Sequence, residues 1–259
     1  MSALSTRRIR ALTTLLVLSV GSAAGAQQAE SVLNAGRPEF WWIGGALVVA
    51  AAVSDAAVER ASLAHRSATL DDFADAGNVL GAGRYLLPAL GATYLTGRLA
   101  HEPRMADGAL HAAGAYALGN VLTSIGKPLV GRHRPDTTGS PWRFHAFARE
   151  GARHSWPSAH TLHAFTLAGV LAEEAHRPWV TAGVYGAATL VGWSRVYNDE
   201  HWASDVAVSA VLGAAIGHLT VRRLHARRSA RWRLYIVPGL ERGAVISARW
   251  EPNSGDTDQ

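Results

Sequence analysis

Apolar residues dominate six segments of this chain, and polar stretches separate them. The six segments are Phe40–Val58, Arg84–Ala100, Gly108–Ile125, Ser158–Ala175, Trp179–Trp193 and Ser204–Leu224. Their length and their content of Ala, Leu, Val and Gly favour helices over strands. The pattern therefore predicts an all-α fold, a bundle of six helices.

Three polar stretches between these segments are long enough to matter for function. Glu59–Gly83 has no apolar run and is predicted to be a loop or a short surface helix. Arg132–Pro157 and, more briefly, Ser194–Trp202 are predicted to be irregular loops. Loops of this kind in a helical protein commonly carry the chemistry.

The two ends of the chain differ from the helical part. Residues 1–26 have a basic start, a short apolar stretch and the small residues Ala24-Gly25-Ala26, a pattern typical of a signal peptide cut after Ala26. An uncleaved first membrane helix is the alternative interpretation. Residues 27–228 form the predicted helical domain, and residues 229–259 a tail. Within this tail, Leu234–Val237 and Gly243–Trp250 predict a small β-hairpin or an extended segment.

Composition agrees with one folded domain. The 259 residues are 48% hydrophobic and 17% charged and include no cysteine, which excludes a disordered chain and a disulfide-stapled one. The formal charge of +5 includes Arg7, Arg8 and Arg10 of the predicted signal peptide. A nucleic-acid-binding protein would usually be more basic, so we expect no nucleic acid partner.

The polar residues with chemical potential gather near the ends of the predicted helices. They are Lys127, Arg134, Ser158, His160, Arg195, His201 and Asp205. In an up-and-down bundle these helix ends meet on one side of the molecule. Guanidinium groups and helix-start N–H groups match the charge and geometry of a phosphate-like oxyanion.

Two histidines among these residues suit phosphoryl transfer. His201 and Asp205 are four residues apart, which on a helix places the carboxylate where it can hold one ring nitrogen and leave the other free. Such an imidazole can attack phosphorus, while His160 protonates the leaving oxygen.

Three strings of this sequence resemble the signature motifs of the type 2 phosphatidic acid phosphatase (PAP2) superfamily, which includes vanadium haloperoxidases. The strings are K-x6-R-P (Lys127 to Pro135), P-S-A-H (Pro157 to His160) and S-R-x5-H-x3-D (Ser194 to Asp205). The resemblance implies that Lys127, Arg134 and Arg195 bind phosphate together with Ser158 and the backbone amide of Ala159. It also implies that His160 is the general acid, His201 the nucleophile and Asp205 its orienting partner.

One motif position departs from the family and one stands out by composition. The family usually has Gly where this chain has Ala159, and the added methyl group can narrow the pocket. Lys127 is the single lysine of the chain, since every other residue among the 25 Lys and Arg is an arginine. This placement favours a requirement for a compact ammonium group at that position.

Other interpretations of the same residues stay open. His160 with His163, or Asp199 with Glu200 and His201, could ligate a metal, but the surrounding cations would repel a divalent ion, so we expect no metal and no other cofactor. Trp142, Phe144, Phe147 and Trp156 could form an apolar lip for a lipid chain or simply pack the loop down.

The resemblance implies a phosphoric ester hydrolase that cleaves a phosphomonoester or pyrophosphate through a phosphohistidine. The expected substrate is a lipid phosphate such as phosphatidic acid or a prenyl pyrophosphate. The alternatives are a broad-specificity periplasmic acid phosphatase, a vanadate-dependent haloperoxidase and a non-catalytic lipid-binding bundle. The arginines at 98–104, at 177 and after 222 fall opposite the expected site, which favours a site facing the periplasm. We expect an exported, membrane-embedded or membrane-associated protein of the cell envelope, and the sequence does not indicate an oligomeric state.

Overall fold

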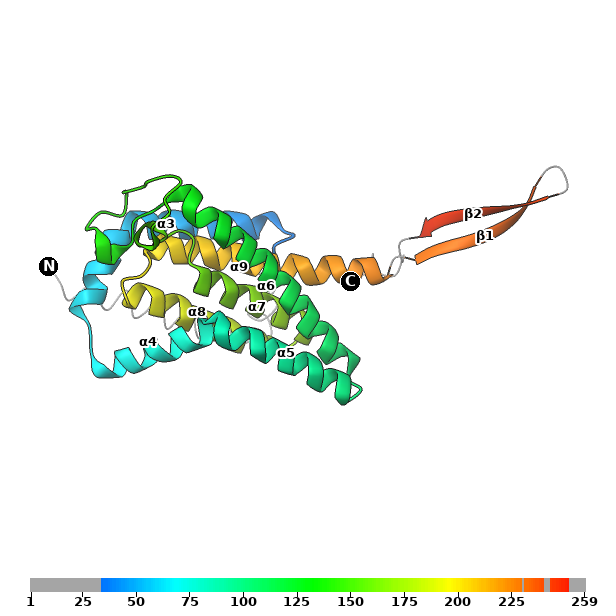
Figure 1. Ribbon diagram of the computed structural model, residues 1–259, viewed down its shortest axis with the longest axis horizontal. Coiled ribbons are helices and arrows are strands. Elements are labelled where there is room, and N and C mark those ends of the chain that lie inside the picture. The colour runs from blue at the N-terminus through cyan, green and yellow to red at the C-terminus, as the bar shows by residue number, and fades with distance from the viewer. Residues whose placement is uncertain (1–33, 230, 240–242, 252–259) are drawn as a thin grey trace.

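The computed structural model describes residues 34–229, 231–239 and 243–251, and this part of the chain is mostly helical (Figure 1). It contains seven α-helices, two short 3-10 turns and two strands. The helices are α3 (Pro38–Ala64), α4 (Ala68–Gly81), α5 (Gly83–Leu99), α6 (Pro103–Val130), α7 (Ala159–Ala175), α8 (Pro178–Tyr197) and α9 (Ala203–Ser229). The turns are Pro135–Thr137 and Gly151–Arg153, and the strands are β1 (Arg231–Gly239) and β2 (Gly243–Glu251).

The expected number of six helices is too low for the described residues. The segment Glu59–Gly83, predicted as a loop or a short surface helix, contains the last residues of α3 and all of α4. The sequence gives only a weak signal for helix α4, because its buried residues, Ala74, Gly77 and Gly81, are small and leave no strong apolar pattern. Proline at the first position of α3, α6 and α8 marks where those helices begin.

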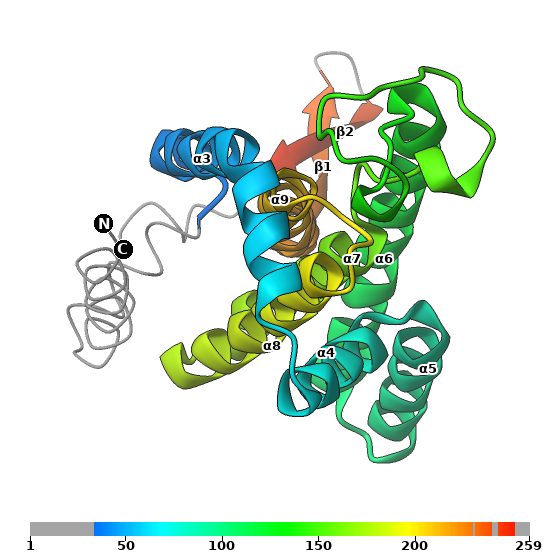
Figure 2. The same ribbon diagram turned by 90° about the vertical axis from the view of Figure 1, so that its left-hand side faces the viewer.

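Small residues allow α7 and α9 to pack closely at the centre of the bundle. A Cβ atom at Gly217 of α9 would lie 2.2 Å from the carbonyl oxygen of Thr166 on α7, and one at Gly213 would lie 2.4 Å from the carbonyl oxygen of Leu162. Around this pair, Val170 and Val221 are fully buried, and α6 and α8 cover its sides (Figure 2). The core is therefore built on close backbone approach more than on large side chains.

The alternating helix directions give the bundle two distinct ends. Helices α6 and α8 end on the side where α7 and α9 begin, and all three predicted motifs lie there. The other end carries Arg98, Arg104, Arg177 and Arg222, at or near the opposite termini of α5, α6, α8 and α9. The arrangement places the catalytic candidates and these four arginines on opposite sides, because successive helices of the bundle run in opposite directions.

The remaining predictions concern the ends of the chain. Strands β1 and β2 pair antiparallel, with Tyr235 opposite Ser247, and extend beyond the end of α9 in Figure 1. The predicted signal peptide, residues 1–26, lies outside the described residues.

Many large apolar side chains of α3 to α6 face outward. By length and composition, α3 and the part of α9 from Ala203 to Ala226 could each cross a membrane. Half of the apolar window of α9 is buried in the bundle, whereas almost none of that of α3 is. On α3, Trp42 and Val53 are both 79% exposed. Such a surface is unusual for a protein surrounded by water on all sides.

Candidate active site

The loops at one end of the bundle bring the motif residues together. Lys127 lies in the last turn of α6, and Arg195 in the last turn of α8. His160 lies in the first turn of α7, and His201 lies two residues before the start of α9. Gly131 ends α6 in the left-handed conformation, where a Cβ atom would lie 1.7 Å from the carbonyl oxygen of His145. Glycine at this position lets the chain turn sharply from Lys127 into the loop that carries Arg134.

His201 is held in one tautomer by the backbone. Its Nδ1 lies 2.5 Å from the carbonyl oxygen of Ser155, and the residue is 2% exposed. A carbonyl oxygen can only accept a hydrogen bond, so Nδ1 carries the proton and Nε2 keeps its lone pair. Burial, together with nearby Lys127 and Arg195, lowers the pKa of His201 well below its usual range. The imidazole is therefore neutral at neutral pH.

Asp205 acts on His201 through intermediate groups, which differs from the direct contact that the sequence predicts. One carboxylate oxygen of Asp205 accepts hydrogen bonds from the Ser155 hydroxyl (2.6 Å) and from the backbone N–H of Trp202 (3.0 Å). The carboxylate thus fixes Ser155, whose carbonyl oxygen holds the ring, and the residue that follows the ring. The spacing of four residues does not produce the direct contact because His201 precedes α9 and lies outside the helix.

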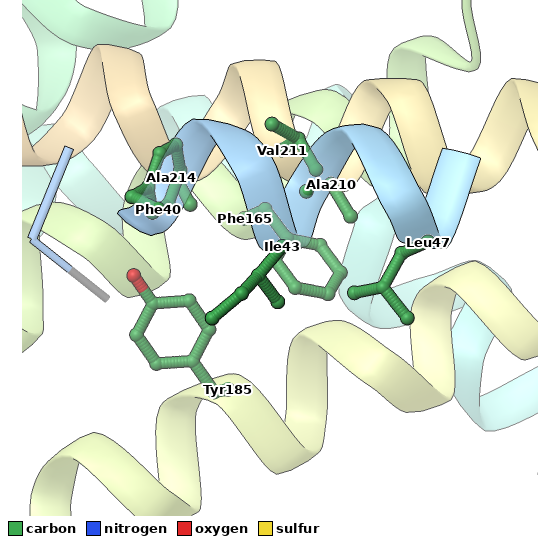
Figure 3. Close-up of a pocket in the computed structure, with 9 residues that line it drawn as sticks. Phe40, Ile43, Leu47, Phe165, Tyr185, Ala210, Val211 and Ala214 are labelled. Carbon is green, nitrogen blue, oxygen red and sulfur yellow. The ribbon is translucent and has the colours of Figure 1, made fainter. Parts of the chain in front are cut away.

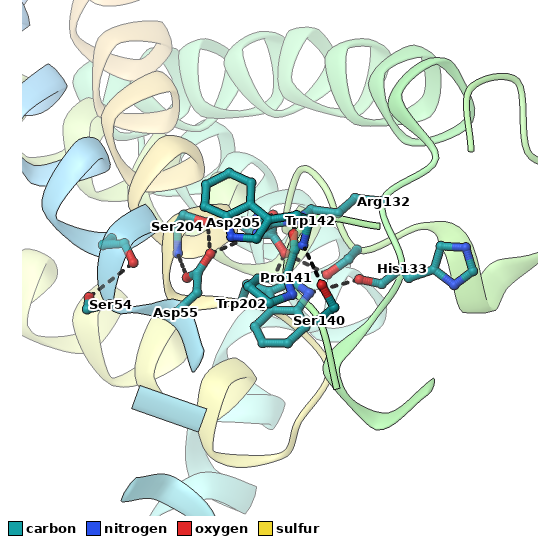
Figure 4. Close-up of polar contacts among 12 residues, drawn as sticks. Ser54, Asp55, Arg132, His133, Ser140, Pro141, Trp142, Trp202, Ser204 and Asp205 are labelled. Carbon is teal, nitrogen blue, oxygen red and sulfur yellow. Dashed lines mark hydrogen bonds and ion pairs between the residues drawn. The ribbon is translucent and has the colours of Figure 1, made fainter. Parts of the chain in front are cut away.

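The other carboxylate oxygen of Asp205 belongs to a buried charge network (Figure 4). The Arg132 guanidinium donates to Asp205 (2.5 Å), to Asp55 of α3 (2.7 Å) and to the Ser204 hydroxyl (2.7 Å). The backbone N–H of Ser204 also donates to Asp55, at 2.8 Å. None of these four side chains is more than 5% exposed. One guanidinium therefore joins α3, the motif loop and the start of α9 without contact with water.

Arg134 and Arg195 form the cationic wall of the site. Both guanidinium groups form ion pairs with the carboxylate of Glu200, at 3.0 Å for Arg134, and the Asn78 side chain of α4 also accepts from Arg195. Burial alone would raise the pKa of Glu200, but Arg195 and Arg134 outweigh it and lower that pKa. The Nε–H groups of both arginines are buried and have no hydrogen-bond partner among the described residues. Two orphaned donors on charged groups that share one carboxylate partner indicate a place for an anion.

The start of α7 and the end of α6 complete the site. The backbone N–H of Leu162 makes the first bond within α7, to the Ser158 carbonyl oxygen, so the amides of Ala159 and His160 lie at the helix N-terminus. Ser158 is fully buried, and its hydroxyl shares a hydrogen bond of 2.9 Å with Thr161. Burial and the neighbouring Arg134 and Arg195 lower the pKa of Lys127 to about 8. Burial and Arg195 lower the pKa of His160 to about 4.

The metal-ligand sets considered from the sequence are not assembled among the described residues. His163 is buried and stacks on Tyr116, with ring centroids 4.0 Å apart. Asp199 is paired with Arg66, at 2.6 Å, and Glu200 with the two arginines. The carboxylates next to His201 are therefore engaged by cations.

Sequence reasoning missed four residues that shape this site: Asp55, Asn78, Arg132 and Ser155. Asp55 did carry a signal, since it is an isolated acid inside an apolar segment, where a charge needs a partner. Arg132 lies inside the first motif. Ser155 acts through its backbone carbonyl oxygen, and Asn78 accepts a hydrogen bond from Arg195, which is 117 residues away in the sequence. No local sequence pattern predicts either role.

Comparisons with known proteins find similarity to PAP2-type phosphatases. A sequence model of the PAP2 superfamily matches residues 108–229. A lipid A 1-phosphatase from Porphyromonas gingivalis is 36% identical over 105 residues, which cover 40% of this chain and 21% of that protein. The chain therefore matches about a fifth of the length of this curated relative.

Two crystal structures share the fold. The first is a transmembrane PAP2-type phosphatidylglycerolphosphate phosphatase from Bacillus subtilis, with a TM-score of 0.57 and 22% identity, covering 71% of this chain and 94% of that one. The second is LpxE from Aquifex aeolicus, with a TM-score of 0.52 and 26% identity, covering 63% of this chain and 92% of that one. The region that matches the PAP2 superfamily model, residues 108–229, contains all three motifs.

Proposed function

We propose that this protein is a phosphatase that removes phosphate from a lipid phosphate through a phosphohistidine formed at His201. The observation that carries the proposal is the pairing of two features. The neutral His201 ring has a free Nε2, and the buried Nε–H groups of Arg134 and Arg195 lack a partner within the described residues. A nucleophile beside an anion site is what phosphoryl transfer requires.

In the first step, His201 Nε2 attacks phosphorus, and the bond from phosphorus to the ester oxygen breaks. His160 gives its proton to the leaving oxygen. In the second step, a water molecule attacks the phosphohistidine, His160 takes up the water proton, and inorganic phosphate leaves. Lys127, Arg134 and Arg195 neutralise charge on the non-bridging oxygens, and the Ser158 hydroxyl and the Ala159 amide complete the cradle.

The protonation states favour these roles once substrate is bound. The cations around His160 contribute to its low pKa in the free protein. A phosphate dianion introduces opposite charge beside the ring, which raises the pKa of His160 and lets it hold the proton that a general acid needs. His201 keeps its neutral form because Nδ1–H remains on the Ser155 carbonyl oxygen.

Apolar surfaces of the bundle support a lipid substrate. Trp142 and Phe147, in the loop that carries Arg134, are 62% and 76% exposed, so they are available as an apolar lip. A cavity between α3 and α8 is lined by Phe40, Ile43, Leu47, Phe165 and Tyr185 (Figure 3), and its lining is almost entirely apolar. The curated relative is named as a lipid phosphatase. An apolar lip beside a cationic site, with an apolar cavity further along α3, suits a molecule with a hydrocarbon chain and a phosphate.

The distribution of charge supports a location in the cell envelope. The bundle end opposite the site carries Arg98, Arg104, Arg177 and Arg222, and basic residues near helix ends prefer the cytoplasmic side of a membrane. We infer a membrane-associated protein whose site faces the periplasm.

The proposal is tested by phosphate release from purified protein in EDTA. The panel contains phosphatidic acid, a prenyl pyrophosphate, phosphatidylglycerol phosphate and a small aryl phosphate, each with the wild type and with His201→Ala. We expect release from the lipids, abolished in His201→Ala, while binding of vanadate as a phosphate analogue persists because the cations remain. His145→Ala, an exposed loop histidine, is the matched control and should keep full activity.

Each other outcome selects another function. Release from the aryl phosphate alone would indicate a broad-specificity acid phosphatase. Halide oxidation that depends on added vanadate would indicate a haloperoxidase. Unchanged turnover in His201→Ala would refute the phosphohistidine mechanism, and lipid binding without turnover in the wild type would indicate a lipid-binding bundle.

A further inference from the structure

Three metal-ligating side chains meet at the bundle end opposite the candidate active site. They are His111 of α6, Glu174 of α7 and His225 of α9. Glu174 Oε1 lies 2.5 Å from His111 Nδ1 and 3.5 Å from His225 Nε2. One ligand atom from each residue lies within 4.8 Å of the other two. His111 is 6% exposed, so the cluster is anchored in the bundle rather than spread over its surface.

The cluster borders a cavity that contains further donors. The cavity has a volume of about 360 Å³, and besides the three clustered residues it is lined by Arg104, Asp107 and His176. His176 ends α7 in the left-handed conformation, with φ at 47°, at the border of this cavity. Asp107 and Glu174 contribute two carboxylates against the guanidinium of Arg104, so the charge of the lining does not oppose a cation.

We propose that His111, Glu174 and His225 bind a divalent transition-metal ion of the zinc class. Two imidazoles and one carboxylate form a donor set that suits zinc, whereas calcium and magnesium prefer oxygen ligands alone. In a tetrahedral zinc site with bonds of about 2.0–2.1 Å, neighbouring ligand atoms lie about 3.3 Å apart. The contact between His225 and Glu174, at 3.5 Å, is close to this length, and that between His111 and Glu174 needs to open by less than about 1 Å. The ring nitrogens of His111 and His225 lie within 4.8 Å and need to approach by at most about 1.5 Å.

The role of this ion is structural. It would tie together α6, α7 and α9, three helices that each carry residues of the candidate active site at their other ends. Because the ion binds the folded state, it raises the free energy of unfolding. Well above the Kd, this increase grows with the logarithm of the ratio of the zinc concentration to the Kd. Phosphate release continues in EDTA, since no step of the proposed chemistry uses this ion.

Zinc titration of the full-length protein tests the site. The protein, purified in detergent, stripped with EDTA and desalted, is titrated with zinc chloride by calorimetry, and its melting temperature is measured with and without zinc. We expect one ion per chain and a higher Tm with zinc. Glu174→Gln keeps the shape of the side chain but removes its charge, and His225→Ala removes an exposed ligand, so each should weaken zinc binding at least about tenfold.

His65→Ala is the matched control, because His65 is exposed and lies outside the cluster. It should bind zinc as the wild type does. The inference is overturned if zinc does not bind saturably, if both cluster variants bind it with unchanged affinity, or if binding is lost in His201→Ala instead. These outcomes are independent of phosphate release, so they leave the proposed function untouched.

Discussion

The candidate nucleophile is positioned by a backbone carbonyl oxygen, not by a carboxylate. Ser155 fixes the tautomer of His201, and Asp205 fixes Ser155. The carboxylate is thus a positioning group that acts one residue removed from the ring. Glu200 forms ion pairs with Arg134 and Arg195 in the free protein. Its carboxylate therefore occupies part of the space between these two phosphate-binding candidates.

Lys127 should set the alkaline limit of activity. Its pKa is lowered to about 8, so its positive charge is present below that pH and is lost as the pH rises through it. We expect kcat/KM to fall above about pH 8 with the slope of a single proton. In Lys127→Arg the cation persists, because the guanidinium stays protonated throughout the range, and the fall should move to higher pH even if the maximum is lower. An unchanged alkaline limit in Lys127→Arg would assign it to another group.

Two helices that precede the three motifs support the site from outside. Helix α4 approaches α8 closely because Gly77 and Gly81 have no side chain to keep the two backbones apart. A Cβ atom at Gly81 would lie only 2.5 Å from Val191. This approach lets Asn78 hold Arg195. Helix α3 contributes Asp55 to the network of Arg132 and Asp205. Both elements lie before residue 108, outside the part of the chain that matches the superfamily model.

The buried network predicts an order of stabilities. In Asp55→Asn, Arg132 keeps Asp205 as its partner, so we expect a loss of about 1–3 kcal/mol in the free energy of unfolding. In Arg132→Leu, two buried carboxylates lose their cation, and the loss should reach about 3–5 kcal/mol. Arg132→Leu should also lower kcat, because Asp205, whose carboxylate fixes Ser155, loses the guanidinium that holds it.

Denaturant unfolding in detergent measures the two losses. Ser54→Ala is the control, since that hydroxyl bonds only to carbonyl oxygens of its own helix. An Asp55→Asn variant less stable than Arg132→Leu would contradict the account of the network.

At the scale of the whole molecule, charge and apolar surface have a definite arrangement. The candidate site and the arginine-rich termini lie at opposite ends, and α3 exposes its apolar side chains along its length. Asn34, just before α3, accepts hydrogen bonds from His218 and Arg222, so the chain enters the bundle at the arginine end. If the bundle crosses a membrane with its site in the periplasm, residue 34 is cytoplasmic, and cleavage after Ala26 in the periplasm cannot also occur.

The surface of α3 should determine membrane attachment. Replacing Trp42 and Val53 together by Glu places two charges on its exposed face, and we expect the protein to shift from the membrane to the soluble fraction. Release from a small aryl phosphate, where the wild type shows it, should persist, because neither side chain contacts the site. Asp72→Ala, an exposed change on α4, is the control. Retention of the double variant in washed membranes would assign attachment to another surface.

The mass of the mature protein distinguishes the two arrangements, because it shows at which residue the chain begins. An uncleaved chain goes with a spanning bundle whose arginine end is cytoplasmic. A chain that begins at Gln27 goes with a bundle that lies in the periplasm and rests on the membrane.

The sequence by itself determined the helical class, the three motifs and the end of the bundle where they meet. Helix-length apolar segments and residues grouped at their ends are local properties, and antiparallel packing of successive helices then brings those ends together. It did not reveal α4, because small buried residues leave no apolar pattern.

Only the tertiary structure decided which atoms touch. It placed the Ser155 carbonyl oxygen on His201, joined Asp55 to Arg132 across 77 residues, and assembled His111, Glu174 and His225 at the far end. The physical reason is that such contacts depend on helix rotation and loop path, which are set by packing over the whole bundle and not by any local pattern.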